Sequence, residues 1–212
     1  MNKLYKYPRT YHFDWSPGTT SDDRILHDID SFTKMKEVVV SEKLDGENTT
    51  LYNDATHARS LDSRHHPSRN WVKGLWGSIQ YYIEEDMRIC GENLFAKHSI
   101  FYDNLPSYFL VFGIYQGEFC LSWDDTVEIC ELLGLTMVPV LYRGPWDLEA
   151  IKACYTGTSQ FGGEQEGYVV RNADGFGITN FKTNCAKMVR AKHVNTSDFW
   201  MTQAVVPNKL QR

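Results

Sequence analysis

Short runs of β-branched and aromatic residues, separated by turn residues, follow one another along most of the chain and predict strands. Two of these runs, 38–43 and 47–52, flank Asp45-Gly46. Glycine tolerates the left-handed backbone that a tight reversal demands, so the chain is predicted to turn between the two runs. Lys43 then lies at the end of the first strand and faces the turn.

Further strands are predicted wherever a comparable run occurs. Residues 108–115 and 118–121 are predicted to form a hairpin that turns at Gln116-Gly117. The first strand of this hairpin is almost entirely apolar, which predicts burial on both faces. The other predicted strands span 87–90, 137–141, 164–171, 176–182 and 186–193.

Helical spacing of apolar residues is less common along the chain. A helix is predicted from Ser68, and we interpret its large apolar side chains as core rather than as a platform for stacked bases. These side chains are Trp71, Leu75, Trp76, Ile79, Tyr82 and Ile83. A capping box at Ser122 predicts a second helix that ends at Gly134, and shorter helices are predicted over 22–29 and 145–155.

Residues 1–30 are predicted to form an N-terminal arm packed on the rest of the chain. The first part of this arm is too aromatic for disorder, while Pro8, Pro17 and Gly18 interrupt it too often for a helix. The chain has 212 residues, 42% of them hydrophobic, and it contains no repeat or linker. We therefore expect a single domain over residues 1–212.

Composition narrows the possible partners. A formal net charge of -5 argues against indiscriminate coating of nucleic acid, so a polyanion would have to meet a local group of Lys and Arg. The N-terminus lacks an apolar signal region, and no run approaches the roughly 18 apolar residues of a membrane helix. A soluble, unexported protein is expected. The five cysteines form no Cys-x-x-Cys pair and are interpreted as reduced core thiols rather than metal ligands or nucleophiles.

Lys43 is the first candidate for chemistry. A lysine can act as a nucleophile, but its reference pKa of about 10.4 keeps it protonated unless neighbouring cations or a metal lower that pKa. Taken alone, Lys43 fits a solvated turn lysine better. The polar loop 58–69 carries three arginines and suits an anion, and we interpret His65-His66 within it as an exposed pair rather than zinc ligands.

Several short motifs support the reactive interpretation of Lys43 by their order and spacing. They are Lys43-Leu44-Asp45-Gly46, Arg59, Gly91-Glu92, Phe109–Gly113, Glu166–Val170 and Arg190-Ala191-Lys192. Together they resemble the successive motifs of the covalent nucleotidyltransferases, which comprise polynucleotide ligases and messenger-RNA capping enzymes. Lys43-x-x-Gly46-x-Asn48 and the short Arg190-x-Lys192 most resemble ATP-dependent RNA ligases of the type of the second phage RNA ligase. The resemblance implies an α+β adenylation domain, with antiparallel sheets flanked by helices and an AMP pocket between the sheets.

The resemblance also implies a reaction and its residues. Lys43 would attack the α-phosphorus of ATP to form lysyl-AMP, the AMP would pass to a 5′-phosphate of RNA, and a 3′-hydroxyl would displace it. Glu166 would hold Mg²⁺ or Mn²⁺, and Asn48 and Arg59 would meet the 5′-phosphate. The implied catalytic residues are Lys43, Glu166, Arg190 and Lys192, and the implied ATP contacts are Lys43, Arg59, Glu92, Phe112, Glu166, Arg190 and Lys192. Lys182 and Lys187 are alternatives if the last motif is shifted.

The implied setting is a monomeric, cytoplasmic protein of bacterial or phage origin that binds RNA ends and no membrane. The chain ends soon after Lys192, which leaves no room for an OB-fold domain or a full C-terminal helical domain. We expect either a minimal ligase or a catalytic domain cut from a longer chain. The alternatives are a minimal ATP-dependent DNA ligase or nick sealer, and a non-catalytic module that binds nucleotides or RNA ends. A capping guanylyltransferase is less favoured, since its last motif normally lies in the OB-fold domain.

Overall fold

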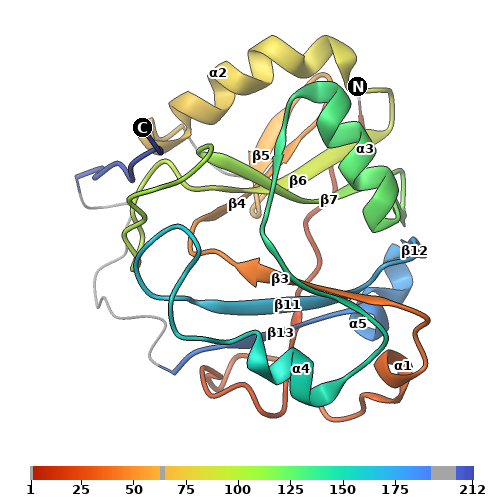
Figure 1. Cartoon of the computed structure of the whole chain (residues 1–212). Coiled ribbons are helices and arrows are strands. Elements are labelled where there is room, and N and C mark those ends of the chain that lie inside the picture. The colour runs from red at the N-terminus through yellow and green to blue at the C-terminus, as the bar shows by residue number, and fades with distance from the viewer. Residues whose placement is uncertain (1, 63–64, 192–203) are drawn as a thin grey trace.

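The structure of the chain is a computed structural model that describes residues 2–62, 65–191 and 204–212. Its strands form two sheets that lie one above the other, with helices on their outer faces (Figure 1). The α+β fold and the largely antiparallel sheets are as predicted.

The first sheet contains the strand that ends at Lys43. In spatial order its strands are β10 (Val140–Gly144), β3 (Val38–Lys43), β11 (Gly167–Asn172), β13 (Cys185–Val189), β1 (Tyr11–Phe13) and β2 (Ile25–Leu26). Only the pairs β13–β1 and β1–β2 within this sheet are parallel among the described strands. The apolar run that begins β3 is fully buried, which explains why β3 occupies an interior position with a partner on each side.

The second sheet contains the longest described strands. In spatial order it consists of β12 (Phe176–Gly177), β8 (Phe119–Cys120), β7 (Phe109–Gln116), β6 (Met87–Asn93), β4 (Glu47–Leu51) and β5 (Thr56–Ala58), with β9 (Thr136–Met137) paired to β7. Nearly every residue of β7 is buried, so the prediction of a strand covered on both faces is confirmed.

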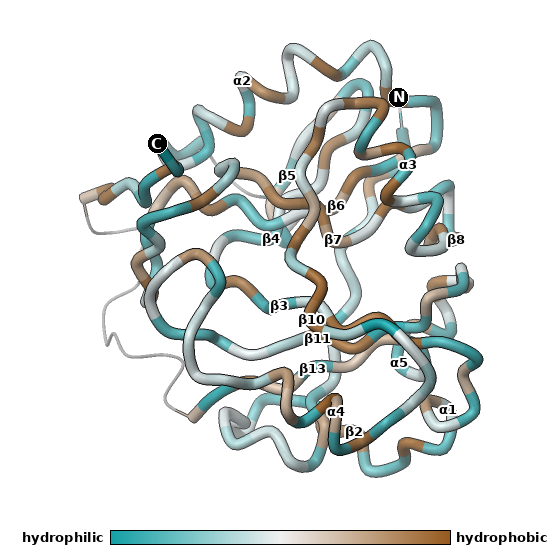
Figure 2. Tube along the Cα trace, viewed as in Figure 1, coloured by the Kyte–Doolittle hydropathy of each residue, from teal (hydrophilic) through white to brown (hydrophobic). Residues whose placement is uncertain are grey.

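Helices pack against both sheets. They are α1 (Asp30–Thr33), α2 (Asn70–Ile79), α3 (Trp123–Leu133), α4 (Leu148–Ala153) and α5 (Phe181–Asn184), with short 3-10 turns at Pro67–Arg69, Gln80–Tyr82 and Ile178–Asn180. Hydrophobic and hydrophilic positions alternate along α2 (Figure 2), and its apolar side packs on β6 and β7. The prediction that these side chains are core is confirmed except at Tyr82, which is 72% exposed.

The caps of α3 are as predicted. Ser122 Oγ accepts a hydrogen bond from the backbone N–H of Asp125 at 3.1 Å, and Gly134 ends the helix with a left-handed φ of 65°. Among the glycines, this is one position where the backbone itself requires the residue.

Four sequence predictions of local structure are wrong. The helix predicted over 22–29 is instead the short strand β2, and the helix follows it as α1. The strand predicted over 176–182 continues only through Gly177, after which the chain turns helical. Residues 137–141 divide between β9 and β10, which belong to different sheets. Short polar-flanked segments have little preference of their own, and the sheet edges that they meet decide their conformation.

The fourth wrong prediction is the reversal between two paired strands after Lys43. Strands β3 and β4 do not pair with each other, because the chain passes from the first sheet to the second at Asp45-Gly46. Gly46 is not left-handed either. A Cβ atom at this position would lie 2.7 Å from the backbone oxygen of Asn93, so the glycine is required by the close approach of β6.

The described residues of the N-terminal arm contact both sheets. Its backbone is tied to the second sheet where the N–H of Tyr5 donates to the hydroxyl of Tyr52 at 2.9 Å, and it joins the first sheet as β1. Cys90, Cys120, Cys130 and Cys185 are buried in the core, as predicted, while Cys154 is partly exposed. Within the described residues, no helix combines the length and the apolar character needed to cross a membrane.

Candidate active site

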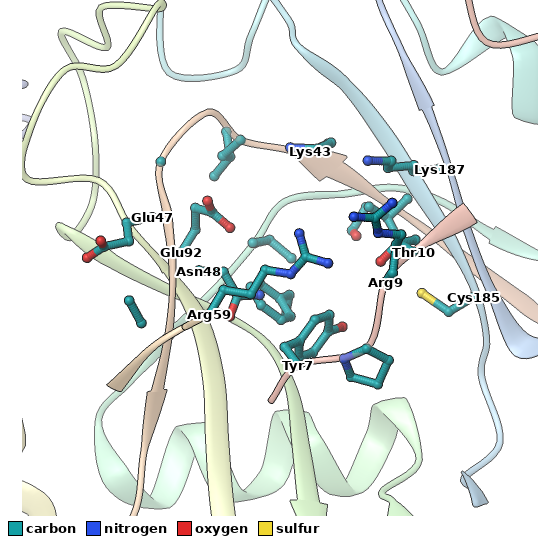
Figure 3. Close-up of a pocket in the computed structure, with 18 of the residues that line it drawn as sticks. Tyr7, Arg9, Thr10, Lys43, Glu47, Asn48, Arg59, Glu92, Cys185 and Lys187 are labelled. Atoms are coloured by element: carbon teal, nitrogen blue, oxygen red, sulfur yellow. The ribbon is translucent and has the colours of Figure 1, made fainter. Parts of the chain in front are cut away.

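A cavity of about 790 Å³ lies between the two sheets and contains Lys43. Its volume is within the range of small-molecule sites. Both sheets and the N-terminal arm contribute to its wall (Figure 3). The lining residues that carry the argument below are Tyr7, Glu42, Lys43, Asn48, Arg59, Glu92, Phe112 and Lys187.

Lys43 is the last residue of β3 and is held against a carboxylate. Its Nζ donates a hydrogen bond to Oε2 of Glu166 at 2.7 Å, and the Glu166 side chain is only 7% exposed. Lys43 of β3 pairs with Gly167 of β11, and this pairing places the side chain of the preceding residue, Glu166, next to that of Lys43. Burial alone would lower the pKa of Lys43, but the carboxylates of Glu166 and Glu92 outweigh burial and hold that pKa above its ordinary value.

Glu92 is the second carboxylate near Lys43. It lies on β6 and points into the cavity (Figure 3). The pKa of the Glu92 carboxyl is raised to about 8, mainly by burial and in part by the nearby charge of Glu166, while Lys43 opposes the shift. Burial also raises the pKa of Glu166. A cation bound beside Glu92 and Glu166 would favour the charged form of both carboxyls and so lower their pKa values.

Among the other cationic side chains that line the cavity, Arg59 and Lys187 face it from opposite sides. Arg59 follows β5 and extends into the cavity, and Lys187 enters it from β13 (Figure 3). Burial, with a contribution from the charge of Lys43, lowers the pKa of Lys187 to about 8. A group of cations in a partly buried cavity is suited to phosphate oxygens.

The apolar end of the cavity is built on Phe112 of β7. The ring of Tyr7, from the N-terminal arm, packs edge-on against Phe112 with centroids 5.2 Å apart. Arg171 supports the same strand, since its Nη1 donates to the backbone oxygen of Phe112 at 3.2 Å. This end of the cavity can enclose a flat aromatic ring.

Asn48 lines the cavity next to Glu47, which forms a buried ion pair with Arg69. The guanidinium of Arg69 donates from Nε to Oε2 of Glu47 at 2.7 Å and from Nη2 to the other carboxylate oxygen. This two-point contact fixes the start of α2 to β4, next to Asn48. The side-chain oxygen of Asn48 is buried and makes no hydrogen bond within the described part of the chain.

The structure places most of the sequence-predicted residues together. Lys43, Asn48, Arg59, Glu92 and Phe112 line the cavity, and Glu166 contacts Lys43 directly. Arg190 differs, because it is not among the lining residues and its Nη2 lies 3.0 Å from Oε2 of Glu164. Lys192 lies outside the described residues. Lys187, which we considered as an alternative, is the β13 cation that faces the cavity.

The sequence analysis did not identify Tyr7 and Glu42 as residues of the site, although both line the cavity. Glu42 is 2% exposed, accepts a hydrogen bond from the backbone N–H of Gln160 at 3.2 Å, and has a second oxygen, Oε1, without a partner in the described residues. Its signal was available, since a glutamate two residues after the run Val38–Val40 is unusual in a central strand. Tyr7 gave no such signal, because nothing local links the arm to the cavity.

Comparisons with known proteins agree with this geometry. A family model described as RNA ligase matches residues 36–189. Naegleria gruberi RNA ligase with pyrophosphate superposes with a TM-score of 0.55 at 19% identity, covering 74% of this chain and 50% of that chain. A variant of the same ligase with ATP and Mn superposes with a TM-score of 0.55 at 18% identity, covering 78% of this chain and 53% of that chain. Another variant, with AMP and Mn, superposes with a TM-score of 0.53 at 19% identity, covering 74% of this chain and 51% of that chain.

This chain spans about half the length of those solved ligase chains. At such identities the likeness shows the fold alone. A comparison with curated proteins found no match. The family match covers most of the chain and includes Lys43, Glu92, Glu166 and Lys187, and on that basis the chain belongs to the RNA ligase family.

Proposed function

We propose that this chain is an ATP-dependent RNA ligase that acts through a lysyl-AMP intermediate. The observation that carries the proposal is the position of Lys43 Nζ, which lies 2.7 Å from Oε2 of Glu166 in a cavity that Arg59 and Lys187 also line. Family membership and the solved ligase that binds ATP and Mn support the same reaction.

In the first step Nζ of Lys43 forms a bond to the α-phosphorus of ATP, and the bond from that phosphorus to the bridging oxygen breaks. Pyrophosphate leaves with the electron pair of this bond. Lys43 must lose a proton to react, and Glu166, already hydrogen bonded to Nζ, is positioned to accept it. Lys187 and Arg59 offset negative charge on the phosphoryl oxygens.

The adenosine part of ATP fits the rest of the cavity. Phe112, supported by Tyr7, is proposed to stack on adenine, and Glu92 to accept hydrogen bonds from ribose hydroxyls. The unpartnered Oε1 of Glu42 offers an acceptor for an exocyclic amino group. This last contact would favour adenine over guanine, which presents a carbonyl oxygen at the corresponding ring position.

The donor set also fits a divalent metal ion. Mg²⁺ and Mn²⁺ prefer carboxylate oxygens and phosphates, and Glu166 is a buried carboxylate whose pKa burial raises. Such an ion, when bound, would supply positive charge that stabilises the phosphoryl oxygens. Glu166 is the residue proposed to hold it.

The later steps require an RNA end. Asn48 and Arg59 are proposed to bind the 5′-phosphate, since the amide N–H₂ of Asn48 and the guanidinium of Arg59 can donate to phosphate oxygens and the two residues lie on the same side of the cavity (Figure 3). The AMP would pass from Lys43 to this phosphate, and a 3′-hydroxyl would then displace AMP and form the phosphodiester. Arg190 and Lys192 stay candidates for this later chemistry on the family resemblance alone.

Label transfer tests the proposal. The protein is incubated with Mg²⁺ and α-labelled ATP or GTP, denatured, and examined for covalent label. We expect label from ATP, loss of label in Lys43→Ala, and unchanged label in Lys34→Ala, a control lysine whose side chain is 76% exposed. Label that persists in Lys43→Ala, or no label in the unaltered protein, would overturn the proposal. Joining assays with 5′-phosphorylated RNA and DNA strands then distinguish an RNA ligase from a DNA ligase.

A further inference from the structure

The C-terminal segment, residues 204–212, lies alongside residues 94–105 and is joined to them by backbone hydrogen bonds. The N–H of Lys97 donates to the oxygen of Val206 at 2.7 Å. Further along, the N–H of Leu105 donates to the oxygen of Lys209 at 2.9 Å, and the N–H of Gln211 donates to the oxygen of Leu105 at 2.8 Å. The segment is therefore attached by isolated β-bridges and backbone hydrogen bonds to a region distant from it in sequence.

Asn208 is the buried centre of this contact. It is 2% exposed, and its side chain uses both of its polar ends. Nδ2 donates to the backbone oxygen of Leu94 at 2.8 Å, and Oδ1 accepts from the backbone N–H of Tyr102 at 2.9 Å. The N–H of Asn208 also donates to the oxygen of Phe95 at 2.9 Å. One side chain thus joins the two ends of the loop between Leu94 and Tyr102.

The loop between Leu94 and Tyr102 is hydrogen bonded to Asp45, which follows Lys43 by two residues. Oδ2 of Asp45 accepts hydrogen bonds from the N–H and the hydroxyl of Ser99, both at 2.7 Å, and from the N–H of Ile100 at 2.8 Å. The backbone N–H of Asp45 donates to the hydroxyl of Tyr102 at 2.9 Å. Leu44, between Lys43 and Asp45, is buried in the same hydrophobic cluster as Leu94, Ile100 and Tyr102.

We propose that Asn208 is a positioning residue for the Lys43 nucleophile, acting through Tyr102 and Asp45. This inference rests on the proposed formation of lysyl-AMP. Attack on phosphorus requires the nitrogen to lie close to the atom it attacks and in line with the departing oxygen, and small displacements cost large factors in rate. Asn208 is not among the residues that line the cavity, and its side chain is hydrogen bonded to the backbone of Leu94 and Tyr102, so its effect should fall on the rate of attack and not on the affinity for ATP.

The test is the single-turnover rate of lysyl-AMP formation at a range of ATP concentrations. For Asn208→Ala we expect the rate at saturating ATP to fall about tenfold, with the half-saturating ATP concentration changed by less than about twofold. Asn208→Asp keeps an acceptor for the Tyr102 N–H but loses the donor to Leu94, and an intermediate rate is expected. Gln211→Ala is the matched control in the same segment, since its exposed side chain makes none of these contacts.

A double-mutant cycle separates positioning from a general loss of stability. Tyr102→Phe removes the hydroxyl that receives the Asp45 N–H. If Asn208 acts through this hydroxyl, the rate losses of the two variants are less than additive when combined, at a temperature where thermal unfolding shows both to be folded. An unaltered rate in folded Asn208→Ala or Asn208→Asp, or fully additive losses, would overturn the inference. Absence of label in the unaltered protein would instead overturn the proposed function itself.

Discussion

Nζ of Lys43 and Oε2 of Glu166 are joined by a 2.7 Å hydrogen bond between residues 123 positions apart in the chain. The pairing of β3 with β11 places them together, and the buried carboxylate keeps the lysine protonated. If Lys43 is the nucleophile that we propose, it is oriented before it is deprotonated, and any cation that neutralises Glu166 also promotes loss of the Lys43 proton.

Removing the charge of Glu166 should therefore lower the pKa of Lys43. In nucleotide-free Glu166→Gln, we expect Lys43 to react with an amine-directed reagent at lower pH than in the unaltered protein, measured by mass spectrometry across a pH series. Glu164→Gln is the control, because Glu164 pairs with Arg190. An identical pH profile in Glu166→Gln and the unaltered protein would contradict the coupling. Lysyl-AMP formation should nevertheless fall about a hundredfold in Glu166→Gln, since the carboxylate also serves the reaction.

Lys187 should make nucleotide affinity depend on pH. Its pKa of about 8 means that it is charged below this pH and loses its charge above it. The half-saturating ATP concentration is thus expected to rise about tenfold above pH 8. Lys187→Arg should remove this rise, since a guanidinium stays charged. Glu92 titrates in the same range, and its contribution remains in both proteins, so the difference between them reports Lys187. Equal pH dependence in the two proteins would show that Lys187 does not bind phosphate.

Glu92 should reduce stability at high pH. Its pKa rises from 4.5 to about 8 on folding, so the folded state binds the proton more tightly and loses stability as pH increases from about 4.5 through 8. Glu92→Gln removes this loss. We expect its Tm without ligands to exceed that of the unaltered protein by about 2–4 °C at pH 9, with a smaller difference at pH 5. A Tm difference that does not change with pH would contradict the raised pKa.

Gly46→Ala should destabilise the fold by steric overlap. The new methyl group would lie 2.7 Å from the Asn93 oxygen and 2.9 Å from Cγ of Glu92. Overpacking of this kind costs about 1–3 kcal/mol. Gly74→Ala is the matched control within α2, where a Cβ meets nothing within 4 Å, and we expect it to stabilise by about 0.5–1 kcal/mol. Urea denaturation measures both, and equal stabilities of the two variants would contradict the close approach of β6.

Much of the site was predictable from order along the chain. Lys43, Glu92, Phe112 and Glu166 each lie in or next to a strand whose apolar pattern was clear, and strand ends present their side chains in a regular way. The α3 helix was equally predictable, because Ser122 and Gly134 act on the backbone within a few residues. In these cases the determining interactions are local, or the motif itself carries the information.

Only the tertiary structure decided which strands pair and which residues distant in sequence line or support the cavity. Asp45-Gly46 looks like a hairpin turn in sequence, yet it carries the chain between sheets because β3 and β4 find better-buried partners elsewhere. Whether Lys187 or Arg190 faces the cavity depends on the register of β13 against β11, and a shift of one residue exchanges the two faces. The roles of Tyr7 and Asn208 depend on contacts across most of the chain. The sequence by itself determined the strands and the chemical groups, whereas long-range pairing determined their arrangement, because burial is shared between segments that no local pattern connects.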